Sequence, residues 1–111
     1  MQDIEKSLQQ FLICLDEKRF YDAHEALEDI WFPKRFEQNN ETLLLKGFIN
    51  ASVSFELKKR GKYLSSLKVW NNYLKYRPLL YKIDSKHLNS YHYVARYIEN
   101  LNSGFSKGSE K

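Results

Sequence analysis

Histidine and carboxylate side chains able to transfer protons or bind a metal ion occur together in one short stretch, residues 20–32, F-Y-D-A-H-E-A-L-E-D-I-W-F. His24 precedes Glu28 by four residues and Trp31 by seven, a spacing that aligns side chains along one side of an α-helix. An imidazole can act as a general acid or base near neutral pH and can also bind a metal. With the adjacent carboxylate of Glu25, this stretch is the candidate ligand-binding site.

A metal-binding interpretation of this stretch rests on two candidate ligands, His24 and Glu28. The run H-E-A-L-E differs from the zinc-protease pattern H-E-x-x-H, because Glu28 occupies the place of the second histidine. A catalytic zinc ion usually takes three protein ligands, and the other histidines, His87 and His92, are far along the chain. Two further interpretations stay open: a hydrogen-bonded pair that fixes the helix, and a small-ligand or acid–base site.

The helix that carries these side chains has recognisable start and stop signals. Asp22 and Glu25 have the spacing of a capping box, which predicts a helix that begins near Ala23. Pro33 lacks a backbone N–H donor and should close it. Apolar residues then fall on one face and acidic residues on the other. His24 lies at the border between them, where the wall of a pocket could form.

Apolar residues at helical spacing predict an all-α domain of about five helices, in which the third is central. The expected helices cover residues 3–16, 23–32, 41–60, 63–76 and about 85–103. The first two should form an antiparallel hairpin across a turn at residues 17–19. Asn39 or Asn40 should cap the third helix and Gly61 should end it. Because the third helix is apolar almost all around, we expect it to be buried.

One stripe of the third helix consists of Leu43, Gly47, Asn50 and Ser54. Its small side chains allow another helix to approach closely, and we expect that neighbour to be the helix of His24. Asn50 and Ser54 would then face the rim formed by His24 and Glu28. Such an arrangement satisfies a buried amide, and it could also complete a site.

The remaining segments give expectations about which side chains point inward. The fourth helix should bury Leu64, Leu67, Trp70 or Val69, and Leu74 before Pro78 breaks it. The fifth should bury Leu88, Tyr91, Ala95, Ile98 and Leu101. Phe36 should fold back from the polar loop after Pro33. Residues 1–102 then form one domain, and residues 103–111 form a flexible tail after a helix that ends before Gly104.

The central stretch resembles a known family, the bacterial and archaeal domain of unknown function number 309. The hallmark of that family is an aromatic-x-x-Ala-His-Glu-x-Leu-Glu-x-x-Trp helix, matched at Phe20, Ala23, His24, Glu25, Leu27, Glu28 and Trp31. A second family segment, Leu-x-Gly-Leu-Ile-Gln-x-Ala, is similar to Leu45, Gly47, Phe48, Ile49, Asn50 and Ala51. Asn50 stands where the family usually has a glutamine. The resemblance, from about Leu12 to Leu101, implies an all-α bundle and no established activity.

Composition limits the classes of protein to which the chain can belong. A length of 111 residues is enough for one domain. The chain has no apolar run as long as a membrane span, and its charged first residues do not resemble a signal peptide. A single cysteine, Cys14, excludes an internal disulfide. We therefore expect a cytoplasmic protein without membrane contact, in which Cys14 is a buried, unreactive thiol.

Charge is distributed unevenly along the chain. Residues 1–56 carry 6 basic and 11 acidic side chains, whereas residues 57–111 carry 12 basic and 3 acidic ones. The basic half also contains many tyrosines, a mixture that can contact phosphates and stack on bases, although it contains no recognisable nucleic-acid module. Opposite charges could instead attract one another within a monomer or between copies in a homo-oligomer.

Two functions therefore follow from the sequence. The first is a small-ligand or metal site at His24, Glu25, Glu28 and Trp31, together with Asn50. The second is a binding or scaffolding module whose basic, aromatic C-terminal half contacts an anionic partner, either nucleic acid or protein. The sequence identifies no cofactor or catalytic residue, and it does not decide whether the protein is an enzyme.

Overall fold

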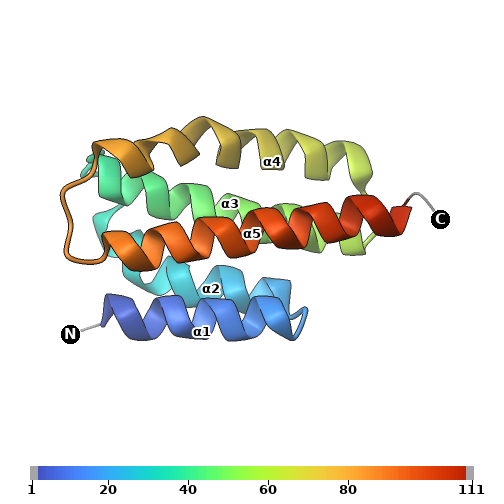
Figure 1. Ribbon diagram of the computed structural model, residues 1–111, viewed down its shortest axis with the longest axis horizontal. Helices are drawn as coiled ribbons and strands as arrows, with labels where there is room; N and C mark the ends of the chain where they lie inside the picture. Colours follow the sequence, from blue (N-terminus) through green and yellow to red (C-terminus); the bar gives the residue numbers. More distant parts are fainter. Residues whose placement is uncertain (1–2, 110–111) are drawn as a thin grey trace.

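Helices make up most of the described part of the chain, and α3 lies at its centre (Figure 1). The computed structural model describes the backbone of residues 3–109 and the side chains of residues 3–105. The α-helices are α1 (Ile4–Asp16), α2 (Phe20–Trp31), α3 (Asn40–Lys59), α4 (Tyr63–Tyr76) and α5 (Leu88–Ser109). Two 3₁₀ helices, η1 (Phe32–Lys34) and η2 (Arg77–Lys82), follow α2 and α4. The predicted all-α fold with a central third helix is confirmed.

Four of the helices lie side by side in one layer, in the order α1, α2, α3, α4 (Figure 1). α1 forms one edge of this layer and α4 forms the other, while α5 lies across its front. The predicted antiparallel pairing of α1 with α2 is confirmed. Each edge helix has only one neighbour within the layer, so part of its surface remains available to solvent or to a partner.

Local capping signals set several helix ends as expected. The carboxylate of Asp3 accepts a hydrogen bond from the backbone N–H of Glu5 at 3.0 Å, which caps α1. The side chain of Asn39 caps α3 by accepting a bond from the N–H of Thr42 at 2.8 Å. Gly61 follows α3 with φ +78°, a conformation that glycine adopts without steric cost.

The predicted start of α2 is wrong. The helix begins at Phe20, its N-cap is Arg19, and no side chain caps it. Asp22 lies in the first turn, where its carboxylate accepts a hydrogen bond from Arg19 at 2.9 Å. Phe20 is 1% exposed, and its ring packs 5.5 Å from that of Phe55 on α3. Burial of this ring, which outweighs the capping-box signal, explains the earlier start.

The stripe of small residues on α3 faces α4 and not α2, which corrects a second prediction. A Cβ atom at Gly47 would lie 3.0 Å from Cβ of Tyr76. The hydroxyl groups of Ser54 and Ser66 are 3.1 Å apart. α4 is therefore the helix that approaches α3 closely along this stripe.

α4 is rotated relative to the prediction. Leu64, Leu67 and Leu74 were expected inside, yet they are 86%, 58% and 46% exposed. Ser66 and Tyr73 are buried in their place, and Trp70 packs against the core as expected. The close approach at Gly47 and Ser54 explains this choice, because a small serine fits against small residues where a leucine would not.

α5 begins later and ends later than expected. It starts at Leu88 and not near Ser85, and it continues through Gly104 to Ser109. Phe105 stabilises the last turns, since its ring lies 5.5 Å from that of Phe55. Residues 103–109 of the predicted tail are thus helical, and residues 110 and 111 lie outside the described range.

The core contains the predicted inward side chains of α5, together with Val94. Tyr91, Val94, Ala95 and Ile98 are at most 1% exposed, while Leu88 and Leu101 are partly buried. Burial of Cys14 is confirmed as well. Phe36, by contrast, does not fold back. It is 80% exposed, and the guanidinium group of Arg35 lies 4.5 Å from its ring centre.

Candidate functional site

His24 and Glu28 form an imidazole–carboxylate pair on one face of α2. The distance from His24 Nε2 to Glu28 Oε2 is 2.7 Å. The His24 side chain is 22% exposed and that of Glu28 is 42% exposed. The ring of Tyr21 lies 5.7 Å from the imidazole. The pair is therefore accessible from solvent, and Glu28 already engages one of the two ring nitrogens that could transfer a proton.

The other candidate residues do not all lie around this pair. Glu25 is exposed on α2, while Trp31 packs partly against the core. Asn50 donates a hydrogen bond to the carbonyl of Lys46 at 2.8 Å and accepts one from Asn72 of α4 at 3.4 Å. The expectation that Asn50 and Ser54 face the rim at His24 is wrong, because both side chains bond toward α4.

The donor set at His24 is small for a metal centre. Over the described residues, histidine, cysteine and acidic side chains form no group of three or more that could hold a metal ion. His24 and Glu28 supply two ligands, whereas catalytic zinc sites take three from the protein. The site residues therefore offer a partly exposed acid–base pair and an incomplete ligand set.

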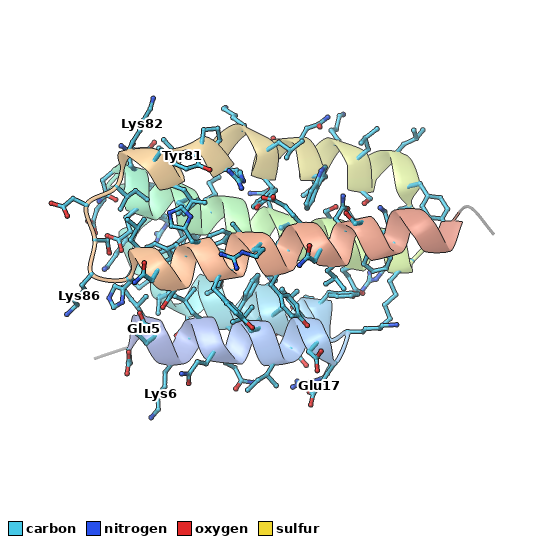
Figure 2. The ribbon with its side chains drawn as sticks, in the orientation of Figure 1. Glu5, Lys6, Glu17, Tyr81, Lys82 and Lys86 are labelled. Carbon is cyan, nitrogen blue, oxygen red and sulfur yellow. The ribbon has the colours of Figure 1, made fainter. Side chains whose placement is uncertain are left out.

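A second imidazole–carboxylate pair joins α1 to the segment before α5. His87 Nδ1 lies 2.6 Å from Glu5 Oε2, and Ser90 donates a hydrogen bond to Glu5 Oε1 at 2.7 Å. The hydrogen bonds from His87 and Ser90 lower the pKa of the Glu5 carboxyl group below its ordinary value. Glu5 lies beside the start of α5 (Figure 2). Sequence reasoning missed this pair because its members are 82 positions apart.

The arrangement at Glu5 does not match a nucleophilic triad. Ser90 and His87 both bond to the carboxylate, whereas a triad requires the serine hydroxyl to bond to the imidazole. A half-open cavity of about 130 Å³ lies next to Glu5, with Leu8, Leu12 and Val94 among its lining residues. We therefore assign the Glu5 cluster to the attachment of α5.

Other carboxylates also attach α5 through hydrogen bonds. Glu41 of α3 accepts a bond from the hydroxyl of Tyr91 at 2.5 Å. Glu99 of α5 accepts bonds from Tyr73 and Arg77, both at 2.7 Å. Burial raises the pKa of Tyr73 and Tyr91, and their hydrogen bonds to glutamates raise it further, so both hydroxyls remain donors. These contacts are structural, because each joins α5 to another helix.

The surface of α4 and η2 combines exposed apolar side chains with basic side chains. Its exposed apolar side chains are those of Tyr63, Leu64, Leu67, Leu74 and Tyr81. Residues 63–82 contain four basic side chains and no acidic one. Tyr81 and Lys82 lie on the same edge of the molecule as α4, and Lys82 points away from the layer (Figure 2). We call Leu64, Leu67 and Leu74 the α4 stripe.

The opposite edge of the layer shows that such a stripe is not a general feature of this fold. α1 is also an edge helix, and its one exposed large apolar residue is Ile13, which is 49% exposed. Its remaining exposed side chains are polar or charged. A sequence signal for the stripe did exist: α4 carries apolar residues on two faces, and one helix cannot bury both at the edge of a layer.

Comparisons with known proteins identify a family and no closer relative. Within the described residues, none of the helices combines the length and apolar character needed to cross a bilayer. No curated protein and no solved structure matches the chain. The family model described as a domain of unknown function (DUF309) matches residues 8–69, more than half of the chain. Since this match covers most of α1, all of α2 and α3, and the first half of α4, the chain belongs to the DUF309 family.

Proposed function

We propose that this protein is a binding module that recognises an anionic protein through the edge formed by α4 and η2. One observation carries the proposal: three leucines are exposed on a segment that also exposes three lysines and has no acidic residue, while its arginine, Arg77, pairs with Glu99. An exposed apolar patch with a charged rim is typical of an interaction surface. Scaffolding or recruitment of another protein is therefore the function that we assign.

The α4 stripe supplies the affinity in this proposal. Full burial of one leucine side chain contributes about 1.5–3 kcal/mol relative to exposure. Leu64 and Leu67 are more than half exposed, so a partner that covers them gains much of this amount. Lys68 and Lys75 lie next to the stripe in sequence and give the surface its preference for negative charge.

A protein fits this surface better than a nucleic acid does. Nucleic acids bind through phosphate contacts with cations and through stacking of bases on aromatic rings. Leucine side chains offer neither interaction, and three of the five exposed apolar residues of this edge are leucines. A protein partner buries these side chains and also contacts the lysines.

The His24 site is the weaker basis for a function. Its histidine and carboxylate are accessible, but Asn50 bonds toward α4 and no third metal ligand joins the pair within the described part of the chain. The α4 edge, by contrast, presents three exposed leucines that are not part of the core. We therefore rank the binding module first.

Fluorescence anisotropy with two labelled peptides tests the proposal. Both peptides have the same leucine content, but one carries glutamates and the other lysines. We expect the acidic peptide to bind and the basic one to bind at least tenfold more weakly. Leu67→Glu should abolish binding, because it adds a carboxylate to the stripe. The matched control is Ile13→Glu, which makes the same kind of change on α1, and it should bind like the wild type.

The salt dependence of binding distinguishes a protein partner from a nucleic acid. Binding of duplex DNA through phosphates would weaken with a log–log slope of about 0.9 per contacted phosphate as salt rises. Peptide binding that depends on leucines should weaken less with salt. Tight, steeply salt-dependent binding of DNA without binding of the acidic peptide would overturn the proposal. Circular dichroism of each variant confirms that the helices remain folded.

A further inference from the structure

The α4 stripe has the residue spacing of a helix–helix seam. Leu64, Leu67 and Leu74 occupy positions i, i+3 and i+10, and Asn71 occupies the intervening position i+7. Steps of three and four residues return a side chain to the same side of a helix and define the a and d positions of a heptad. The exposed face of α4 therefore has the pattern with which one helix packs along another.

The lysines beside the stripe repeat with the same period. Lys68 and Lys75 are seven residues apart on α4, so they lie on one flank of the seam. Lys82 lies beyond the end of α4, on the 3₁₀ helix η2, and adds positive charge at the end of this edge. Residues seven apart drift by only about 20° around a helix. Acidic side chains on a partner helix, also seven residues apart, would lie opposite these lysines.

We propose that the partner of the α4 edge is an amphipathic α-helix with an apolar seam and a row of acidic residues at seven-residue spacing. This inference rests on the proposed binding function and names the kind of protein segment that the edge recognises. The helix would lie next to α4 on the side away from α3, as a fifth member of the layer. Specificity would come from two matches: the apolar seam of the partner with the α4 stripe, and its acidic residues with the lysines beside that stripe.

The position of α4 in the fold supports a helical partner. One face of α4 packs on α3 through Ser66 and Tyr73, and the exposed stripe lies on another face. Because α4 is the edge of a layer in which neighbouring helices are antiparallel, a further helix can repeat the packing that already joins the others (Figure 1). No rearrangement of the core is needed for this docking.

Asn71 argues against a membrane as the partner of this surface. It is exposed and stands between Leu67 and Leu74 in the stripe. A polar amide is costly among lipid chains, whereas one asparagine in a helix seam fixes the register of the partner. The lysines argue against pairing of α4 with α4 of a second copy, since an antiparallel pair would place Lys68 of one copy close to Lys75 of the other.

Two acidic peptides of identical composition test the inference. In the first, leucines follow the three-and-four spacing and glutamates recur every seven residues; in the second, the same residues are shuffled so that no seam forms. We expect the ordered peptide to bind at least tenfold more tightly by anisotropy and to gain helicity on binding. Equal affinities would overturn the helix inference and leave the binding module standing. Failure of both peptides would overturn the module as well.

Charge reversal gives an independent arm of the experiment. The triple variant Lys68→Glu, Lys75→Glu and Lys82→Glu should lose the acidic peptide and bind a seam peptide that carries lysines. The matched control reverses Lys6, Lys34 and Lys86, three exposed lysines outside the α4 edge, and should keep the wild-type preference. Two of these, Lys6 and Lys86, lie away from that edge (Figure 2). Equal losses in the two triple variants would overturn the inference, because net charge alone would then explain binding.

Two further measurements test whether the α4 edge binds a second copy of this chain or a lipid surface instead. Light scattering at micromolar concentration should show a monomer, and a dimer abolished by Leu67→Glu would overturn the inference in favour of a second copy. Sedimentation with phosphatidylglycerol vesicles should leave the protein in solution. Binding to these vesicles, reduced by Leu67→Glu but not by Ile13→Glu, would assign the edge to anionic lipid instead.

Discussion

The hydroxyl oxygens of Ser54 and Ser66 lie 3.1 Å apart where α3 and α4 pack together, and Ser66 also donates a hydrogen bond to the carbonyl of Ser54 at 2.8 Å. Both side chains are buried. The two bonds are compatible when Ser54 donates its own hydroxyl hydrogen to Ser66. This contact fixes which face of α4 turns inward, and it thereby leaves the α4 stripe exposed.

Loss of the Ser66 hydroxyl should destabilise the fold. In Ser66→Ala, the buried hydroxyl of Ser54 loses the oxygen to which it donates, and an unsatisfied buried polar group costs about 1–3 kcal/mol. Urea denaturation followed by circular dichroism measures the effect. Ser65→Ala is the control, because Ser65 is the exposed neighbour on the same helix. Similar midpoints for the two variants would contradict the role of this contact.

A large side chain at Gly47 should also separate α3 from α4. Even a Cβ atom there lies 3.0 Å from Cβ of Tyr76, so Gly47→Leu should reduce the free energy of unfolding by about 1–3 kcal/mol or more through overpacking. Gly104→Leu is the matched control, since, outside its own helix backbone, no atom of the described residues lies within 4 Å of its added Cβ. That control should be neutral or stabilising, because leucine favours a helix more than glycine does. Equal melting temperatures would show that the interface is looser than described.

His24→Ala should have a small effect on stability. The pair with Glu28 is partly exposed, and exposed pairs of this spacing contribute about 0.3–0.5 kcal/mol. Water can solvate Glu28 after the substitution. A loss of several kcal/mol in thermal unfolding would instead indicate a bracing role that these exposures do not explain.

The same variant tests the metal interpretation. We expect zinc, manganese or nickel to leave the melting temperature of the wild type unchanged, because the pair supplies two ligands where a catalytic zinc takes three. A metal-dependent rise in the wild type that His24→Ala loses would establish a site there. His92→Ala controls for metal bound at other histidines, and it should behave like the wild type.

Stability should decrease in acid through the carboxylates that attach α5. Burial acts to raise the pKa of Glu99, but hydrogen bonds from Arg77 and Tyr73 outweigh it and leave that pKa below its ordinary value of 4.5. A carboxyl group whose pKa is lower in the folded state stabilises the fold above its unfolded pKa. This contribution is lost as the pH falls from about 4.5 through the folded value.

Glu99→Gln should therefore be less stable than the wild type at neutral pH and should lose less stability between pH 5 and pH 2, as roughly expected from proton linkage. Melting temperatures across this range measure the effect. Glu25→Gln, an exposed carboxylate on α2, serves as the control and should follow the wild-type curve. Parallel curves for the wild type and Glu99→Gln would contradict the assignment.

Sequence patterns that depend on near neighbours predicted the helices well. The asparagine cap at Asn39, the glycine after α3 and the apolar periodicity of α5 each act within a few residues, so the backbone obeys them wherever the helix is placed. The capping box at Asp22 predicted the wrong helix start because it is also a local signal, and a distant contact outweighed it. Burial of Phe20 against Phe55, a distant residue, overrode a local preference.

The sequence by itself thus determined the all-α class, the central position of α3 and the candidate pair at His24 and Glu28, because helical spacing is a local property. Only the tertiary structure decided which helix packs on Gly47 and which side chains meet Glu5 across the chain. It also decided that the leucines of α4 face outward. α4 has two faces suited to burial, and the fit of Ser66 against α3 selected between them through contacts that no local pattern contains.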